Sequence, residues 1–195
     1  MVRCHCGCRC RIDRQHRRRS LLGRERLEEL DDPELGIDRM LEYYHRKGYS
    51  ENRINQRLKS IEVRKELTDE WERRGVKRGQ EFATLTDIIM QGWSGMTTRQ
   101  YKRYKGLKTE SLRDNMTNLE LVLNMLAEAT TTEISKERRP RTFAANRIVA
   151  AQGGRIAGNT RREIEAETGK KIISRLNAEQ VLAAKEIEQN EEEKE

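Results

Sequence analysis

Apolar residues recur every three or four positions over much of the chain between residues 37 and 168, which is the period of an amphipathic α-helix. The strongest such segment begins at Thr117. Its side chain and that of Glu120 can each satisfy the other's free backbone N–H in a capping box. Four apolar residues then fall on one helical face: Leu119, Val122, Leu123 and Leu126. Since Leu121 and Met125 add a second apolar face, we expect this helix inside a packed bundle, at the centre of the fold.

Caps, glycines and prolines delimit further helices. The predicted spans are 37–47, 51–73, 82–91, 97–105, 143–152 and 155–168. The pair Gly153-Gly154 predicts a break between the last two, and the segment 92–95 predicts a turn. Lys170–Arg175 is the one segment that favours a strand. The sequence therefore predicts a mainly α fold, a compact multi-helix domain with at most a short edge strand near 170–175.

Composition indicates the size of the core and the cellular compartment. Charged residues make up 37% of the chain and apolar residues 34%, so the core must be small for this length. No run of 18 apolar residues occurs, so no membrane span is expected. All four cysteines precede residue 11, so disulfides do not hold the predicted core together and a cytoplasmic location is expected.

The chain divides by composition into three parts. Residues 1–35 are expected to be a disordered, basic, Cys/Arg-rich leader and linker, 36–184 a helical domain, and 185–195 an acidic tail. The leader alternates Cys with other residues from Cys4 to Cys10, without the two-to-four-residue spacing typical of structural zinc sites. We therefore expect no metal there. A wrong start codon or an upstream frameshift is one hypothesis for its composition.

Two basic clusters suggest contacts with nucleic acid. The first has five cations and two tyrosines within ten residues; cations neutralise phosphates, and tyrosines stack on bases. Its candidate residues are Arg99, Lys102, Arg103, Lys105 and Lys108. The second flanks Pro140 and consists of Lys136, Arg138, Arg139 and Arg141, of which the three arginines are candidate phosphate contacts. The alternative is that the tyrosines pack inward and the cations form a solvated face; the sequence leaves both open.

Catalytic motifs are absent from the sequence. Only one of the three histidines, His45, falls in the predicted fold, and no nucleophile elbow or zinc-protease motif occurs. The stretch Gly153–Gly158 lacks the patterns of dinucleotide- and phosphate-binding loops, so its small residues favour a close approach between helices. We expect no enzyme activity, no catalytic residue and no cofactor.

Three blocks of sequence carry a resemblance to a known family. They read INQRLKSIEVRKELTDEWERRGVKRGQEFATLTDII, then YKGLKTESLRDNMTNLELVLNMLAEATTTEIS, then AAQGGRIAGNTRREIEAETGKKIIS followed after one residue by LNA. Over roughly Ile54 to Ala178 the chain resembles the C-terminal region of the DNA-damage-inducible protein D family, which overlaps with Bro-type phage antirepressors. Members of that family typically begin with a Bro-type N-terminal domain linked to DNA binding, which this chain lacks, so it resembles a truncated member.

The resemblance implies a role in the bacterial DNA-damage (SOS) response or in phage gene control. It implies a RecA-type recombinase filament or a phage repressor as partner, and no catalytic residues. Our first hypothesis is a non-enzymatic regulator that binds such a partner and touches DNA phosphate. The second is a protein-interaction or oligomerisation module without DNA affinity, with a second copy of the chain as partner. The third is a metal-dependent nuclease.

Overall fold

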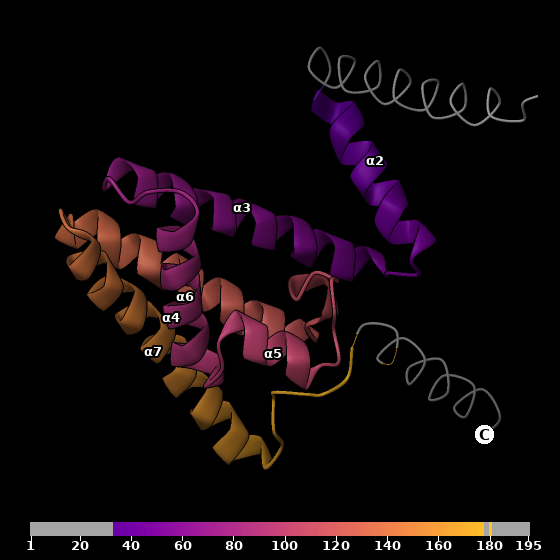
Figure 1. Cartoon of the computed structure of the whole chain (residues 1–195). Coiled ribbons are helices and arrows are strands. Elements are labelled where there is room, and N and C mark those ends of the chain that lie inside the picture. The colour runs from indigo at the N-terminus through magenta and orange to yellow at the C-terminus, as the bar shows by residue number, and fades with distance from the viewer. Residues whose placement is uncertain (1–32, 178–179, 181–195) are drawn as a thin grey trace, which may run out of the picture. The chain divides into compact units, whose positions relative to one another are not determined.

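The computed structural model describes residues 33–177 and residue 180. The chain divides into two compact units between Tyr49 and Ser50. The first unit contributes α2 (Pro33–Arg46), and the second contributes the remaining elements (Figure 1): α3 (Glu51–Arg73), α4 (Gln80–Ser94), α5 (Thr98–Tyr104), the 3₁₀ turn η1 (Arg113–Asn115), α6 (Asn118–Arg138) and α7 (Phe143–Thr168). The described residues contain no strand, which confirms the mainly α prediction.

Parts of the predicted organisation lie outside these residues. The predicted leader as far as residue 32, with all four cysteines, and the predicted acidic tail are not among the described residues. In the first unit, α2 ends at a turn where Gly48 has a φ of 76°. There the Tyr49 N–H donates to the Tyr44 carbonyl at 3.2 Å. This confirms the predicted stop at Gly48, since a left-handed residue after a helix is usually glycine.

The second unit is built around α6. This helix packs against both α3 and α7 (Figure 1). Helix α4 packs mainly against α7 and also contacts α6 and α5. The predicted capping box at the start of α6 is present: the Thr117 hydroxyl accepts from the Glu120 N–H, and the Glu120 carboxylate accepts from the Thr117 N–H. The helix therefore begins where the sequence predicts and lies at the centre of the bundle.

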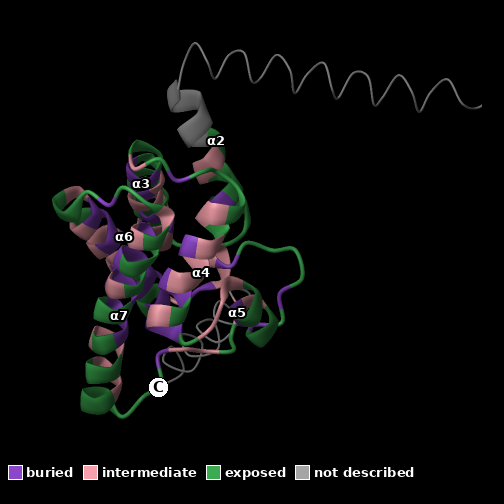
Figure 2. Cartoon of the chain, turned by 60° about the vertical axis from the view of Figure 1, so that its left-hand side comes forward, coloured by how far each residue is buried: buried purple, intermediate pink, exposed green. Residues whose placement is uncertain are grey.

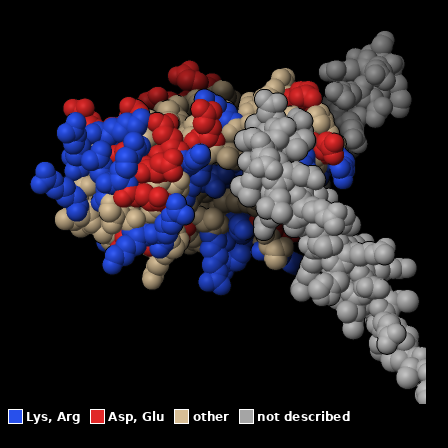
Figure 3. All heavy atoms as spheres, turned by 90° about the horizontal axis from the view of Figure 1, so that it is seen from above, with Lys and Arg blue, Asp and Glu red and all other residues tan. Residues whose placement is uncertain are grey.

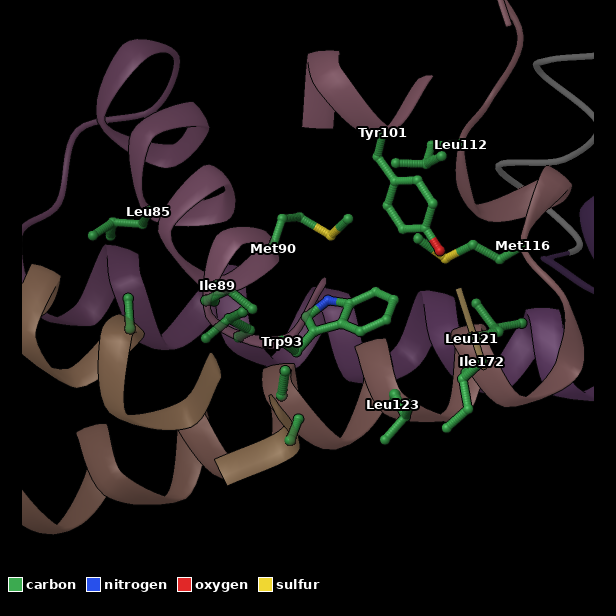
Figure 4. Packing of buried hydrophobic residues seen from close by; sticks show 14 of the residues in the cluster. Leu85, Ile89, Met90, Trp93, Tyr101, Leu112, Met116, Leu121, Leu123 and Ile172 are labelled. Carbon is green, nitrogen blue, oxygen red and sulfur yellow. The ribbon is translucent and has the colours of Figure 1, made fainter. Parts of the chain in front are cut away.

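The core consists mainly of large side chains from α3, α4, α5 and α6, and several of them surround Trp93 and Tyr101 (Figure 4). Its fully buried large apolar members are Leu67, Trp71, Leu85, Ile89, Trp93, Tyr101, Met116 and Leu123. Burying an apolar side chain of this size contributes roughly 1.5–3 kcal/mol. The core is therefore concentrated in one unit and fixes the spacing of its helices.

The inward face of α6 differs from the predicted one. Leu119 and Val122 were predicted to face inward, but they are 38% and 40% exposed. The buried side chains lie mainly on another face, which also carries carboxylate, amide and hydroxyl groups: Glu120, Leu121, Leu123, Asn124, Ala127, Glu128, Thr131, Thr132 and Ser135. The prediction is wrong because cations distant in the sequence, invisible in the local pattern, compensate the buried carboxylates Glu120 and Glu128.

The predicted break at Gly153-Gly154 is also wrong, because α7 runs unbroken from Phe143 to Thr168. A Cβ on Gly154 would lie 2.7 Å from the Ile89 carbonyl oxygen of α4, and one on Gly153 would lie 2.0 Å from the Thr131 Oγ1 of α6. Side chains at these positions would push the neighbouring helices away. The glycines thus allow the close helix approach that the sequence favoured.

The turn predicted at 92–95 begins later than expected. Helix α4 continues through Ser94, and only Gly95, with a φ of 79°, ends it. Gly92 is helical, and a Cβ there would lie 2.7 Å from the Gly154 carbonyl carbon of α7. The two helices therefore touch at glycine on both sides. The buried residues of α7 all precede Asn159, and its last turns are half-buried or exposed (Figure 2).

Residues 170–175 form a loop and not a strand. No second strand is present in the described part of the chain to pair with them. Carboxylates accept two of the backbone hydrogen bonds that a neighbouring strand would otherwise accept. The Ile172 N–H donates to Glu165 at 3.0 Å, and the Ser174 N–H donates to Glu120 at 2.8 Å. Farther on, Asn177 and Gln180 form reciprocal hydrogen bonds, in which each backbone N–H donates to the other residue's side chain.

Candidate nucleic-acid interface

The eight predicted phosphate-binding residues do not form one surface. Helix α5 lies beside the first turn of α6, because Lys105 contacts Glu120 there. Arg138, Arg139 and Arg141 lie at the opposite end of the same helix. Since α6 has 21 residues, the two groups are about 30 Å apart at a rise of about 1.5 Å per residue. They are therefore two candidate sites, described separately below.

Arg138, Arg139 and Arg141, named here the end cluster, lie where α6 finishes. Helix α3 finishes at the same end, since Ser135 of α6 donates to Glu70 of α3 at 3.1 Å. Lysine and arginine side chains gather over this end of the bundle (Figure 3). All three arginines of the end cluster are exposed. These three cations are thus open to a partner, with the exposed Glu133 and Glu137 near them.

Arg139 has an unusual backbone. It is the one described residue other than glycine with a positive φ, at 49°, and its N–H donates to the Ser135 carbonyl at 2.9 Å. Side chains in the left-handed region cost roughly 1–2 kcal/mol, and glycine usually fills this position after a helix. An arginine held there at a cost in stability is consistent with a role for its side chain.

The end cluster keeps its charge. Arg139 and Arg141 form no ion pair within the described residues, and Arg138 donates to the neutral Gln152 at 2.8 Å. Nearby cations differ from them: Lys136 contacts Glu66 at 2.6 Å and Glu133 at 2.7 Å. Hydrogen bonds to these carboxylates raise the pKa of Lys136. Arg139 and Arg141 therefore carry positive charge that no carboxylate of the described residues neutralises.

The first basic cluster, on and after α5, is only partly exposed to a nucleic acid. Arg99, Arg103 and Lys108 are exposed, and Lys102 is half-buried. Tyr104 is 36% exposed, and the Arg175 guanidinium lies 5.3 Å from the centre of its ring. Tyr101 is fully buried in the core. Of the two alternatives in the sequence, the inward packing of the tyrosines therefore holds for Tyr101 but not for Tyr104.

Lys105 was predicted to touch phosphate, and its position contradicts that prediction. Its side chain and that of Glu120 are both fully buried, with 2.8 Å between ammonium and carboxylate. Its Nζ also donates to the Leu176 carbonyl at 2.9 Å. Burial lowers the pKa of Lys105, while the Glu120 carboxylate acts in the opposite sense. Lys105 shares a helical face with the buried Tyr101, and that spacing is the sequence signal that could have placed it inside.

A second buried group of charges was not predicted. Glu128 of α6 accepts from Arg113 at 2.5 Å and lies 3.4 Å from Arg64 of α3. Nearby, Arg57 contacts Asp114 at 2.5 Å. These pairs tie α3, η1 and α6 together. No sequence signal identifies them, because the paired residues are 15 to 64 positions apart.

Neither a metal site nor a membrane-spanning helix is found in the part of the chain that the structure describes. No group of three or more His, Cys, Asp or Glu side chains there could hold a metal ion. No helix there has both the length and the apolar character that crossing a bilayer requires. The predicted absence of a zinc site at Cys4–Cys10 concerns residues outside the described ones and stays a prediction.

Comparison with protein-family models, with curated proteins and with solved structures finds no match to this chain.

Proposed function

We propose that this chain is a non-enzymatic regulator that binds a nucleoprotein or protein partner, and that the end cluster contacts nucleic-acid phosphate. The single observation that carries the phosphate contact is Arg139, an exposed arginine without an ionic partner among the described residues and in a backbone conformation that costs stability. Arg141 lies beside it with its charge equally free. Paired guanidinium groups bind phosphate oxygens through charge and hydrogen bonds.

The cellular setting of the proposal comes from the sequence resemblance. The similarity to the C-terminal region of the DNA-damage-inducible protein D family supports a role in the bacterial DNA-damage response or in phage gene control, in the cytoplasm. The partner that it favours is a RecA-type filament on DNA, or a phage repressor. In such a complex the end cluster would lie against phosphates while the helical faces contact protein. The proposal assigns no catalytic residue.

The phosphate contact is tested by the salt dependence of DNA binding. Fluorescence anisotropy would follow a labelled duplex at several salt concentrations, for the wild type and for the double variant Arg139→Gln/Arg141→Gln. Each phosphate contact adds about 0.9 to the slope of log K against log salt. The double variant should therefore lower the magnitude of the slope by about 1.8 and weaken binding most at low salt.

Two further variants make the test specific. Arg99→Gln/Arg103→Gln removes the same charge from α5, at the other end of α6, and should leave the slope unchanged. Arg139→Gly removes the same cation but relieves the left-handed strain, so it should weaken DNA binding while raising the free energy of unfolding by about 1 kcal/mol. An absence of DNA binding, or equal losses at both ends of α6, would disprove a specific role for the end cluster.

A second candidate function is self-association through α6. Leu119 and Val122, which are 38% and 40% exposed, share a helical face with the half-buried Leu126. Exposed apolar side chains in a row favour burial against another protein surface. A second copy could supply the same row by two-fold symmetry, because isologous interfaces pair a surface with itself.

Light scattering after size exclusion distinguishes this candidate. A dimer that Leu119→Ser/Val122→Ser converts to a monomer would favour an oligomerisation module, especially if DNA binding is absent. A wild-type chain that remains monomeric at concentrations near 100 μM would exclude it. The matched control is Ile148→Ser, which removes an exposed apolar side chain from α7.

A further inference from the structure

A cavity of about 240 Å³ lies between α4, α5, η1 and the start of α6. It is smaller than the roughly 300–1,000 Å³ typical of pockets for drug-sized ligands, so it suits a small group. Its polar lining comes from four segments that are distant in the sequence: Thr86, Thr98, Lys102, Ser111, Arg113 and Asn124. It belongs to neither the end cluster nor the exposed α6 face.

Three of these side chains have a buried polar atom without a hydrogen-bond partner among the described residues. They are Arg113 Nε, Asn124 Nδ2 and Thr98 Oγ1. The Asn124 side chain is almost completely buried, at 1% exposure. Leaving a buried donor unsatisfied costs roughly 1–3 kcal/mol. Nitrogen atoms of this kind can only donate, so the unsatisfied groups call for an acceptor.

The charge around the cavity has the sign that an anion requires. Lys102 and Arg113 line it, and Lys102 has no ion pair in the described residues. The neighbouring Glu128 lies against two arginines, Arg113 and Arg64. Asp87 accepts from the Thr98 backbone N–H at 2.9 Å. No carboxylate is among the residues that line the cavity, so its lining contributes two cations and no anion.

The charges beside the cavity also affect the pKa of Arg64, which lies against Glu128. Burial lowers the pKa of Arg64, Glu128 counteracts this, and the like charge of Arg113 lowers it further. An anion placed beside the two guanidinium groups would relieve that repulsion. The rest of the lining is apolar: Met90, Leu112 and Met116 point toward the ring of Tyr101 (Figure 4), so a bound anion would meet little competing water on that side.

We propose that this cavity binds a phosphate group, held by Lys102, Arg113, Asn124 and Thr98. A phosphate offers several acceptor oxygens, which matches a lining with several unpaired donors and two cations. The group could belong to inorganic phosphate or a small phosphorylated molecule, or it could be the terminal phosphate of a nucleic-acid strand. The inference is independent of the end cluster, since the cavity lies beside the N-terminal half of α6.

The test is a titration of the full chain with inorganic phosphate at constant ionic strength, followed by amide chemical shifts and by calorimetry. Saturable binding is expected, with the largest shifts at Thr98–Lys102 and Ser111–Asn115. Lys102→Gln should weaken binding about tenfold, which is at the low end of the loss of one hydrogen bond to a charged group. Thr98→Val, which keeps the shape of the side chain, should weaken it about threefold.

The matched control is Arg99→Gln, which removes an exposed cation from the same helix without touching the cavity lining. It should leave the phosphate affinity unchanged. Absence of saturable binding, or an equal loss in Arg99→Gln and Lys102→Gln, would overturn the proposal. Circular dichroism of each variant shows whether it is folded; Lys102 is only half-buried, so its replacement should leave the fold intact.

Two further binding experiments distinguish a small phosphorylated ligand from the end of a nucleic-acid strand. A nucleoside monophosphate that binds more tightly than inorganic phosphate would favour a small phosphorylated ligand. A single-stranded oligonucleotide that binds more tightly with a 5′-phosphate than without one, in a manner lost in Lys102→Gln, would favour a strand end. Because the duplex test of the end cluster uses different variants, either proposal can fail while the other holds.

Discussion

Lys105 and Glu120 form the most deeply buried ion pair in the described residues. Each has a second role: Glu120 accepts from the backbone N–H groups of Thr117 and Ser174, and Lys105 donates to the carbonyl of Leu176. Taking two charges out of water is costly, and the pair is stable only because these hydrogen bonds accompany it. The pair Lys105–Glu120 therefore connects the end of α5, the start of α6 and the loop after α7.

Replacing one partner alone should therefore be strongly destabilising. We expect Lys105→Met to lower the free energy of unfolding by about 3–5 kcal/mol, because it leaves the Glu120 carboxylate buried and unpaired. The double variant Lys105→Met/Glu120→Gln should lose less, since no unpaired charge stays buried, although the single amide oxygen of glutamine can accept from only one of the two N–H groups, that of Thr117 or that of Ser174. Urea denaturation measures both. Equal losses in the two variants would show that the charge on Glu120 is not the source of the cost.

Tyr101 makes stability depend on alkaline pH. Burial, together with the Glu120 charge, raises the pKa of its phenol above its ordinary value, which is about 10. Above that pH the unfolded chain releases the proton while the folded chain keeps it, so the free energy of unfolding falls as pH rises. The fall between about pH 9.5 and 11 should be shallower in Tyr101→Phe. The lowered pKa of Lys105 acts in the opposite direction in both proteins, so their difference reports on Tyr101.

Among the elements, the contact between α4 and α7 depends on glycine. Gly92 and Gly158 add to the close approach at Gly154, since a Cβ on Gly158 would lie 2.4 Å from the Gly92 carbonyl oxygen. Glycine inside a helix costs about 1 kcal/mol relative to alanine. The close packing of the two backbones offsets this cost, because core side chains on both helices then come into contact.

The same contact predicts the effect of adding one methyl group. Gly154→Ala should lower the free energy of unfolding by about 1–3 kcal/mol through overpacking, although alanine is the better helix former. Asn159→Ala, on the exposed side of α7, is the control and should be neutral or slightly stabilising. Thermal and urea denaturation compare the two variants. If Gly154→Ala were the more stable, the close approach of α4 and α7 would be refuted.

At the scale of the whole molecule, the segment after α7 closes the helical unit. Ile172 is buried, and the next residues supply the hydrogen bonds to Glu120 and Lys105 across 54 and 71 positions of sequence. The segment has no regular secondary structure, yet it covers the buried ion pair. Its contribution to stability is therefore larger than its conformation suggests.

A truncation series measures that contribution. A chain that ends at Gly169 should lose about 3 kcal/mol of unfolding free energy, because Ile172 and the backbone partners of Glu120 and Lys105 are removed. A chain that ends at Asn177 keeps these contacts and serves as the control. Urea denaturation at neutral pH compares both with the full chain. An unchanged midpoint after truncation at Gly169 would mean that water replaces the segment without cost.

The sequence by itself determined the features that depend on residues a few positions apart. The capping boxes Thr117–Glu120 and Thr97–Gln100 form because both partners belong to one helical turn. The stops at Gly48 and Gly169 follow from the conformational freedom of glycine, which has positive φ at both. These local signals were enough to predict the helical class and the start of α6.

Only the tertiary structure decided what depends on distant partners. Whether Leu119 or Glu120 faces inward depends on Lys105 and Ser174, and whether Gly154 breaks a helix depends on Gly92. The same holds for the candidate sites: a run of basic residues does not show that Lys105 is buried or that Arg139 is about 30 Å away from α5. The physical reason is that burial and pairing energies arise between segments, which the local period of a sequence does not record.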